Sequence, residues 1–454
     1  MRTFFIQTLG CRVNHYEAEQ MAALLRHRGL VEATDASSAD LRIVHTCSVT
    51  TEAAAKSRQA VRRAVRGRSL SVREDRQADG RRPQARTIVT GCWAVSNPSD
   101  ASAIDGVAAV IGHGDDLARG LHRLIDAHHP VTPPAGPSFA LPLLGDTRAA
   151  HQRAFLKVQD GCDAHCTYCI IPTLRPALWS KPVDECVEEA RRLVEAGHRE
   201  VVLTGIFLGA FGQRTALRRR QIEAPNHLAA LVEALCTRVP GLLRLRLSSL
   251  EPGDMTPDLV RALSDHRQVV PHFHLPLQSG SDRILRRMNR QYRRDDFLRM
   301  VDRVRAAFDR PALTTDIIVA FPGESEQDFG QTLDLVDRVG FIHVHAFGFS
   351  PRPGTAAARW IEHAVAPPVA SRRIAMLMER ATRHSLEFRR QFIGRTVQIL
   401  VERPKHPTLR FGRCERYFDV EVDDAGLRAG DLVTVRIEAV ETRRTVGRLT
   451  GRER

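Results

Sequence analysis

The 454-residue chain has no apolar run of about 18 residues, the length that a membrane-spanning helix requires. Its beginning, Met1-Arg2-Thr3-Phe4-Phe5-Ile6-Gln7, reads as a strand. It lacks the longer apolar core and the small-residue cleavage site of a signal peptide. We therefore expect no association with a membrane and a cytoplasmic location.

Acidic residues are too few to balance the basic ones. Asp and Glu number 53 against 67 Lys and Arg, mostly arginine, so the formal net charge is +14. Such a basic protein favours polyanions, which predicts a nucleic-acid partner. The alternative is a drift of composition towards arginine, which would scatter charge without making a site. The length allows about three domains, each with its own core.

Cysteine is limited to nine residues. In a cytosolic chain, grouped cysteines are more often metal ligands or redox groups than disulfides. Cys186, Cys236 and Cys414 lie within ordinary helix or strand patterns, and we interpret them as packing residues. The other six lie beside Gly, Thr or Asp in loop-like contexts, and they form two groups of three.

The first group of cysteines follows strands. Residues 1–130 alternate strand and helix signals, which predicts a small α/β domain with a mostly parallel sheet. Cys11, Cys47 and Cys92 each come just after an apolar strand. Because the carboxyl ends of parallel strands share one edge, where ligands bind, the three thiols should converge there. We interpret them as ligands of a cluster held by three thiolates; the alternative is three unrelated buried thiols.

The second group, Cys162, Cys166 and Cys169, has C-x3-C-x2-C spacing within one loop. Three thiolates this close can hold three corners of a metal centre, and no fourth cysteine is near. Zinc sites usually combine C-x2-C with a second pair, and His165 suits solvent or packing better than a metal. An iron–sulfur cluster with one open iron could bind and cleave a substrate here, whereas a closed four-thiolate site could only be structural or pass electrons.

The remaining pattern predicts further domains. Residues 67–86 read as a flexible polar insertion, and prolines between 130 and 148 predict a semi-rigid linker. Six strand–helix units over 149–370 fit an open, partial barrel with its chemistry at the carboxyl ends of the strands. From Phe392, short strands and turns predict a small β-barrel of a kind that often binds RNA; a purely structural tail is the alternative.

A cysteine loop with this spacing, after the first strand of a six-unit barrel, resembles the radical S-adenosylmethionine superfamily. In that superfamily three thiolates hold a [4Fe-4S] cluster, and its unligated iron binds S-adenosylmethionine, whose reductive cleavage yields a 5′-deoxyadenosyl radical. Further segments resemble the methylthiotransferase family. They are residues 8–14, 46–50, 159–162, 169–172, 276–281 and 315–324. The resemblance covers essentially the whole chain.

This resemblance implies a domain order and two cofactors. The implied domains are an N-terminal methylthiotransferase cluster domain (1–130), a linker (131–148), a radical S-adenosylmethionine barrel with a connecting helix (149–385) and a TRAM RNA-binding domain of OB-like β-barrel fold (391–454). The cofactors are two [4Fe-4S] clusters, one for each group of cysteines, and S-adenosylmethionine. The first cluster would carry the sulfur, which one S-adenosylmethionine methylates. A second yields the radical that removes hydrogen from an adenine C2, a carbon that acid/base chemistry cannot activate.

Residues 203–212 and 246–251 resemble the group of this family that acts on N6-threonylcarbamoyladenosine at position 37 of tRNA, next to the anticodon. Alternatives are isopentenyladenosine in tRNA or an aspartate of a ribosomal protein. A non-catalytic RNA-binding or iron-storage protein would not need the complete second group of cysteines. The implied partners are the tRNA anticodon stem-loop, an electron donor such as flavodoxin or ferredoxin, and a sulfur donor.

Barrel geometry predicts residues that position S-adenosylmethionine. Thr204 and Gly205 end the second barrel strand, where backbone can approach the methionine amino group; a simple turn is the alternative. Ser248 ends the third strand and, with Glu251, could face the ribose. Gln278, with Ser279, ends the fourth strand and opens a helix, where a plain N-cap at Ser279 or Ser281 is the alternative.

Other polar residues carry broader expectations. Arg218-Arg219-Arg220 and the arginines of 286–294 could hold tRNA, although each is otherwise a solvated face. In the tail, Arg413 and Tyr417 offer charge and stacking for single-stranded RNA. Asp316, within the fifth strand, is either a packed polar residue or a ligand.

Three positions depart from the family pattern. His45 replaces the Asn usual before Thr-Cys, Arg175-Pro176 stands where Arg-Gly is usual, and Ala320 stands where Gly is usual. None removes a cluster ligand, so we expect effects on loop geometry more than on activity.

Overall fold

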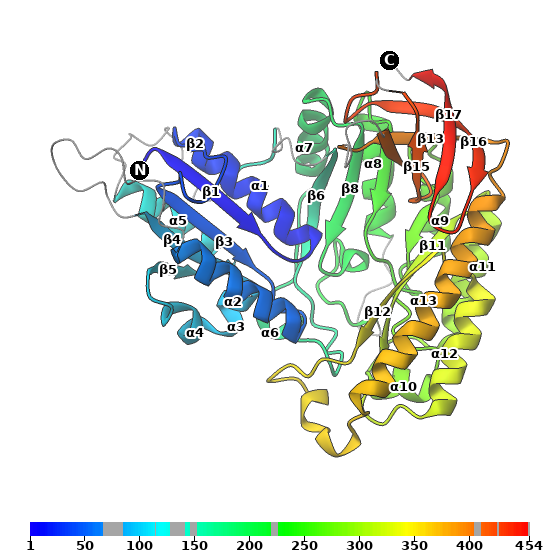
Figure 1. Cartoon of the computed structure of the whole chain (residues 1–454). Coiled ribbons are helices and arrows are strands. Elements are labelled where there is room, and N and C mark those ends of the chain that lie inside the picture. The colour runs from blue at the N-terminus through cyan, green and yellow to red at the C-terminus, as the bar shows by residue number, and fades with distance from the viewer. Residues whose placement is uncertain are drawn as a thin grey trace. The chain divides into compact units, whose positions relative to one another are not determined.

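The computed structural model describes residues 1–66, 85–113, 115–127, 141–145, 152–218, 226–403, 410–424 and 426–452 (Figure 1). The chain forms two compact units. The first holds Met1–Arg148 with Thr173–Arg175, and the second holds Ala149–Pro172 with Pro176–Arg454. Most of the predicted insertion at 67–86 and of the predicted linker lies outside the described residues. Within the described ranges, no helix is both long and apolar enough to cross a membrane.

The first unit is built on a five-stranded parallel sheet of order β2-β1-β3-β4-β5. Its strands are β1 (Thr3–Thr8), β2 (Val31–Glu32), β3 (Leu41–Thr46), β4 (Arg86–Gly91) and β5 (Val107–Ile111). Its helices are α1 (Arg12–His27), α2 (Thr51–Arg66), α3 (Cys92–Ser96), α4 (Pro98–Ser102) and α5 (Asp115–Asp126). Neighbouring residues of strand β3 pack into hydrophobic cores on opposite faces of the sheet. Ile43 packs with α1 and α5, while Val44 packs with α2 and α3. Helices therefore cover both faces of the sheet, and the predicted α/β fold is confirmed.

The second unit begins with an open barrel made of two sheets, β7-β6-β8-β9 and β10-β11-β12. The strands are β6 (Arg153–Asp160), β7 (Trp179–Ser180), β8 (Glu200–Gly205), β9 (Arg244–Leu247), β10 (His272–His274), β11 (Ala312–Val319) and β12 (His343–Gly348). A parallel bridge from Leu245 to Val269 and a hydrogen bond from Leu250 N–H to the His274 carbonyl join the two sheets. All strands except the short β7 run parallel, as expected for a partial barrel.

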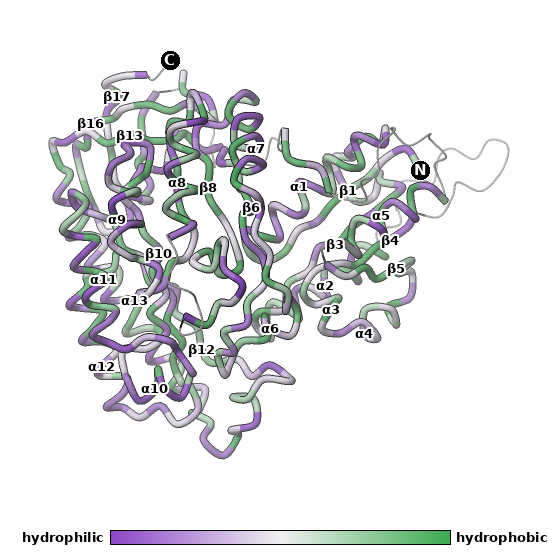
Figure 2. The backbone as a smooth tube through the Cα atoms, turned by 180° about the vertical axis from the view of Figure 1, so that it is seen from behind, coloured by the Kyte–Doolittle hydropathy of each residue, from purple (hydrophilic) through white to green (hydrophobic). Residues whose placement is uncertain are grey.

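Helices cover the outside of this barrel. They are α7 (Val183–Glu195), α8 (His227–Arg238), α9 (Pro257–Ser264), α10 (Asp282–Arg287), α11 (Arg294–Ala307), α12 (Glu326–Val339) and α13 (Pro367–Arg390). The short helix α6 (Ile171–Leu174) follows the second cysteine group, and its residues from Thr173 onwards belong to the first unit. Hydrophobic and hydrophilic residues alternate along the helices around the strands, as one-sided packing requires (Figure 2). Leu203, Leu247, Phe273, Ile317 and Val344 face one large apolar core with these helices.

The opposite face of the barrel strands is polar. Successive strand residues point to opposite faces, so residues adjacent to those core positions face the inside. These inward residues are Lys157, Glu200, Thr204, Arg246, Ser248, His274, Thr314, Asp316 and His345. Several are deeply buried; Glu200 and Arg246 are each 1% exposed. The barrel thus encloses a polar interior, which is the structural basis of its candidate site.

The C-terminal part is a small closed barrel of order β13-β14-β15-β17-β16. Its strands are β13 (Thr396–Val401), β14 (Arg410–Cys414), β15 (Asp419–Val422), β16 (Leu432–Val440) and β17 (Thr445–Arg452). Cys414 packs in its apolar core, as predicted for that cysteine. Strand β14 is not evident from the sequence, because Arg410, Gly412 and Arg413 carry little strand signal.

Candidate functional site

The first cysteine group lies at one edge of the sheet in the first unit. Cys11 caps α1 after β1, Cys47 follows β3, and Cys92 begins α3 after β4. These strands are neighbours in the sheet, so their carboxyl ends meet. At Gly10 (φ +107°) a Cβ would lie 2.8 Å from Cys47 Cβ and 3.0 Å from its Sγ. Glycine therefore lets the Cys11 loop approach Cys47.

Hydrogen bonds hold these loops together. The Asn14 side-chain amide donates to the carbonyl of Leu9 at 2.8 Å and to that of Thr46 at 3.0 Å. Burial, with smaller contributions from the thiols of Cys11 and Cys47, raises the pKa of Cys92 to about 12. Buried thiols of this kind lose their protons when a cationic metal centre binds.

One carboxylate beside this group binds His45, which departs from the family pattern, and Arg175, which precedes the departing Pro176. Arg175 donates to both oxygens of Glu17 at 2.8 Å, and His45 Nε2 lies 3.1 Å from Glu17. Glu17, His45 and Arg175 are all buried. The favourable charge of Arg175 acts on Cys92, opposing the rise in its pKa. The network therefore links the His45 departure to the environment of the cysteines.

The second cysteine group occupies the loop after β6 in the second unit. A side chain at Gly161 (φ +78°) would collide with the Ala177 carbonyl oxygen, so glycine is required where the loop begins. Ala164 N–H donates to Cys162 Sγ at 3.4 Å, and Cys169 N–H donates to the Cys166 carbonyl at 3.0 Å. Burial raises the pKa values of Cys162 and Cys169 to about 12, with Cys166 contributing to both.

Neither cysteine group converges as the ligands of one ion would. Within the described residues, the one set of His, Cys, Asp or Glu ligand atoms lying within 4.8 Å of one another is His274, Asp316 and His345. Each thiolate of a [4Fe-4S] cluster binds a different iron, so its sulfurs stand further apart than ligands of a single ion. The two thiol groups fit such clusters better than a zinc ion.

Arg290, predicted to contact tRNA, is instead buried against the second cysteine group. Its Nη1 donates to Cys166 Sγ at 3.0 Å and approaches Tyr168 Oη at 3.4 Å, while Nη2 pairs with Glu251. Burial alone would lower the pKa of this guanidinium, but Glu251 and the neighbouring phenols raise it. Glu251, expected to face a ribose, is therefore engaged by Arg290. No sequence pattern predicts this pairing across 39 residues.

Thr204 and Gly205 end β8 and Ser248 follows β9, as expected, whereas Gln278 lies in the segment between β10 and α10, whose N-cap is Ser281. Thr204 and Ser248 are buried on the inner face, and the Ser248 hydroxyl is buried without a hydrogen-bond partner. An unsatisfied hydroxyl at this position fits a site that accepts a polar ligand. At Gly205 a Cβ would lie 3.0 Å from the Gln159 side chain, so the position is tightly packed. Gln278 (φ 61°) donates its N–H to the Asp316 carbonyl at 2.8 Å.

Ala320, the third departure, has φ 58°. This left-handed conformation explains why glycine would suit the position. The Ala320 N–H donates to Glu324 Oε2 at 2.6 Å, and Glu324 also pairs with Arg373. The backbone turn is thus kept by polar contacts despite the alanine.

Other side chains predicted to contact RNA have partners within the chain. Arg218 pairs with the buried Asp254 at 2.6 Å, and Arg219 and Arg220 lie outside the described residues. The Tyr417 ring stacks on His272 at 4.4 Å between centroids, with Arg413 over it at 4.5 Å. These side chains therefore join the small barrel to the open barrel and do not present free stacking surfaces.

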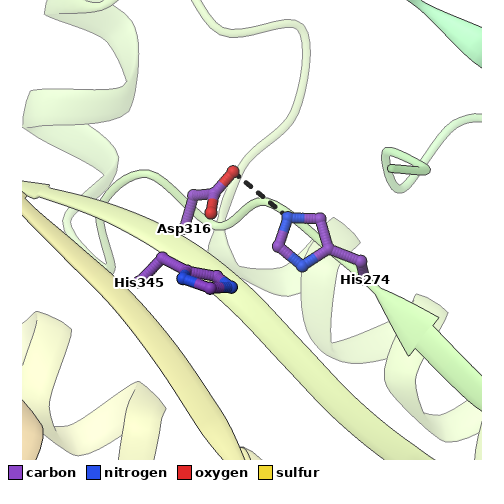
Figure 3. A group of neighbouring side chains, drawn as sticks. All are labelled: His274, Asp316 and His345. Carbon is purple, nitrogen blue, oxygen red and sulfur yellow. Dashed lines mark hydrogen bonds and ion pairs between the residues drawn. The ribbon is translucent and has the colours of Figure 1, made fainter. Parts of the chain in front are cut away.

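A cluster of His274, Asp316 and His345 was not predicted as a unit (Figure 3). A signal was present, because the patterns His272-x-His274 and His343-x-His345 place paired imidazoles on one face of a strand. The sequence alone could not show that these two strands flank the strand of Asp316. The three ligand atoms could hold a metal ion or a polar organic group.

Comparison with known proteins agrees with this architecture. Family models match the Radical SAM superfamily over residues 156–336 and the Uncharacterized protein family UPF0004 over residues 3–112. The Thermotoga maritima protein "Threonylcarbamoyladenosine tRNA methylthiotransferase MtaB" is 34% identical over 97% of this chain and 95% of its own. The Maricaulis maris "tRNA-2-methylthio-N(6)-dimethylallyladenosine synthase" is 35% identical over 100% of this chain and 98% of its own.

A solved structure supports the fold alone. The radical S-adenosylmethionine methyltransferase TsrM from Kitasatospora setae, with cobalamin and a [4Fe-4S] cluster, aligns at a TM-score of 0.54 and 12% identity, covering 79% of this chain and 77% of its own. The full-length relatives carry the family assignment. Members of this family are enzymes that use S-adenosylmethionine and [4Fe-4S] clusters. The two groups of cysteines are suited to hold such clusters, and the polar barrel interior is suited to bind S-adenosylmethionine. The chain belongs to the radical S-adenosylmethionine methylthiotransferase family.

Proposed function

We propose that this enzyme adds a methylthio group to C2 of N6-threonylcarbamoyladenosine at position 37 of tRNA. The observation that carries the proposal is the pairing of two separate three-thiol groups, one at the sheet edge of the first unit and one on the loop after β6. A single cluster would suffice for radical formation. A second group of thiols is what a sulfur-inserting reaction needs in addition.

The proposed roles divide between the two groups. Cys162, Cys166 and Cys169 hold the cluster that binds S-adenosylmethionine, and when bound these cofactors supply the radical that attacks an unactivated carbon. Cys11, Cys47 and Cys92 hold the cluster that presents sulfur. Thr204, Gly205, Ser248 and Gln278 position S-adenosylmethionine at the inner face, where Ser248 offers an unsatisfied hydroxyl. Arg290 positions Cys166 through its sulfur contact.

We assign the proposed parts as follows. Residues 1–130 form the sulfur-carrying domain, 131–148 link it to the radical barrel of 149–385, and 391–454 form a TRAM domain that helps to bind the tRNA anticodon stem-loop. A reductant such as flavodoxin or ferredoxin and a separate sulfur donor complete the reaction. Such partners place the reaction in the cytoplasm.

The choice of nucleoside rests on sequence segments 203–212 and 246–251. Relatives named for threonylcarbamoyladenosine and for dimethylallyladenosine are similarly identical to this chain, so overall identity does not separate the two substrates. Isopentenyladenosine is the second candidate, favoured only by those relatives. A ribosomal-protein aspartate is a third, and the tRNA named by the relatives disfavours it.

Mass spectrometry of tRNA nucleosides tests the proposal. Deletion of the gene should remove 2-methylthio-N6-threonylcarbamoyladenosine and leave the methylthio derivative of isopentenyladenosine. In the purified enzyme, Cys162→Ala should abolish release of 5′-deoxyadenosine. Cys92→Ala should retain that release and lose sulfur transfer, while Cys236→Ala, at a packing thiol, should retain both. Unchanged tRNA in the deletion strain would contradict the proposal.

A further inference from the structure

His274, Asp316 and His345 come from three adjacent strands of one parallel sheet (Figure 3). Asp316 of β11 and His345 of β12 are direct partners in the strand register. His274 of β10 pairs in register with Thr314, one step along the same face, and its Nε2 lies 3.1 Å from Asp316 Oδ2. Strand pairing therefore fixes all three side chains together, which makes the cluster preorganised.

A polar neighbour supports the orientation of His274. Thr314 Oγ1 lies 3.0 Å from His274 Nδ1 and 3.2 Å from His272 Nε2. Since Nδ1 faces Thr314, the imidazole presents Nε2 to Asp316. The ring of His274 also meets the His345 ring edge-on at 5.8 Å between centroids.

The cluster is accessible on the inner face of the barrel. The side chains of His274 and Asp316 are 14% and 29% exposed, and His345 is exposed. By strand alternation they share this face with Thr204 and Ser248, the residues proposed to position S-adenosylmethionine. A substrate atom held near that cofactor would thus have the cluster on the same side of the sheet.

The surroundings are rich in polar groups. His343 lies beside His345, with 4.3 Å between ring centroids. Partial desolvation and the neighbouring imidazoles lower the pKa of His343 to about 4, so this side chain is neutral at pH 7. A neutral imidazole offers one donor and one acceptor. The cluster and this neighbour together present several donors and one carboxylate within a small area.

We propose that His274, Asp316 and His345 form the binding site for the polar N6 substituent of the substrate adenosine, which rests on the proposed function. A threonylcarbamoyl group carries a carboxylate, a hydroxyl and a ureido group. The His345 imidazole is complementary to the carboxylate, while His274 orients Asp316, whose carboxylate is complementary to the hydroxyl or a ureido N–H. The cluster is thereby a specificity determinant for a polar substituent over a hydrocarbon one.

An isopentenyl substituent fits this surface poorly. It offers no hydrogen-bonding atom, so its binding would remove water from two imidazoles and a carboxylate without replacement. A site that hydrogen-bonds a polar group of its substrate strongly rejects an analogue without that group. An apolar pocket rejects a substrate with an additional polar group much less strongly. The hydrogen-bonding polarity of the inner face thus favours the threonylcarbamoyl nucleoside.

Binding of synthetic anticodon stem-loops to the enzyme with both clusters reconstituted tests this inference. Three loops of one sequence carry adenosine, N6-threonylcarbamoyladenosine or N6-isopentenyladenosine at position 37, and fluorescence anisotropy gives their Kd values. The wild type should bind the threonylcarbamoyl loop at least 10-fold more tightly than the adenosine loop. His345→Phe and Asp316→Asn should each reduce that preference about 10-fold and leave binding of the adenosine loop unchanged.

A matched control and a metal assay complete the test. His266→Gln, which removes an imidazole paired with Glu233 outside the cluster, should keep the full preference. A preference unchanged in both cluster variants, or absent from the wild type, overturns the inference. One equivalent of zinc that is lost in Asp316→Asn also overturns it, because the cluster would then be a metal site.

Failure of the proposed function is distinguishable. A wild type that methylthiolates the isopentenyl loop and not the threonylcarbamoyl loop contradicts the proposed function and the inference together. A wild type that methylthiolates the threonylcarbamoyl loop while the cluster variants keep their preference contradicts the inference alone.

Discussion

The guanidinium of Arg290 donates to the sulfur of Cys166 at 3.0 Å. Sequence reasoning had assigned this arginine to tRNA, yet it is 8% exposed and also pairs with Glu251. A fixed cation at a ligand sulfur stabilises negative charge on it, which tunes the reduction potential of a cluster held there. The ion pair therefore belongs to the environment of the second cysteine group.

Arg290→Gln should destabilise the protein by about 3–5 kcal/mol, because Glu251 would remain buried without its partner. The double variant Arg290→Gln/Glu251→Gln should regain much of this stability, because neither buried charge remains. Urea unfolding of samples with matched iron content measures both effects. Additive losses from the two single changes would show that the residues do not act as a pair.

Glu17→Gln should lower the iron content of the reconstituted enzyme by about half, from roughly eight irons to roughly four. The change weakens the contacts of Arg175 and His45 beside Cys11, Cys47 and Cys92 and leaves the second group intact. Glu52→Gln is the matched control, because Glu52 forms an exposed pair with Lys56 on the same unit. Full iron content in Glu17→Gln would show that the Glu17 carboxylate is not needed for the first group of cysteines to hold its cluster.

Much of the fold was predictable from the sequence. Strand and helix periodicity indicated both α/β parts, and turns with short strands indicated the small barrel, because these patterns reflect local geometry and one-sided burial. The cysteines were predictable as two groups because three of them follow strands whose carboxyl ends must meet. The β14 strand was missed because its glycine and arginines lack β-branched or aromatic character.

The site was less predictable where it depends on pairing between distant elements. Arg290 and Arg218 each read as a solvated basic residue, and only the fold reveals their partners Glu251 and Asp254. Tyr417 likewise looked free for RNA until His272 was placed against it. Sequence spacing shows which residues share a face of one element, and it does not show which faces meet.

Ala320→Gly should stabilise the enzyme by about 1 kcal/mol. Alanine at φ 58° carries the strain of the left-handed region, which glycine avoids, although glycine also gains entropy in the unfolded chain. Thermal unfolding at matched iron content measures the change. Ala312→Gly, in the regular strand β11, is the control and should destabilise. A loss of stability in Ala320→Gly would mean that the alanine methyl group contributes more through packing than the backbone conformation costs.

Glu200 should contribute pH-dependent stability through its contacts with Arg246 and Arg244. Burial alone would raise its pKa, but the two guanidinium groups lower it to about 2 from an ordinary value near 4.5. Between pH 2 and pH 4.5, the Glu200 carboxyl group therefore binds fewer protons in the folded state than in the unfolded state. Its contribution of about 3 kcal/mol is complete above pH 4.5 and is lost as pH falls towards 2.

Unfolding by urea between pH 6 and pH 3, at the same cluster content for every sample, checks this contribution. Wild type and Glu200→Gln should differ most above pH 5, and their difference should shrink as the pH falls. Glu233→Gln, at an exposed carboxylate, should follow the wild type throughout. A difference that is independent of pH would place the effect in packing rather than in charge.

The central claim is tested most directly by one reaction of the reconstituted enzyme with tRNA that carries N6-threonylcarbamoyladenosine. The mixture contains a reductant, a sulfide source and S-adenosylmethionine with a deuterated methyl group, and the nucleosides are analysed by mass spectrometry. We predict 2-methylthio-N6-threonylcarbamoyladenosine with the deuterated methyl group, formed together with 5′-deoxyadenosine. Formation of 5′-deoxyadenosine without this nucleoside, with methylthiolation appearing only on isopentenyladenosine, would contradict the account.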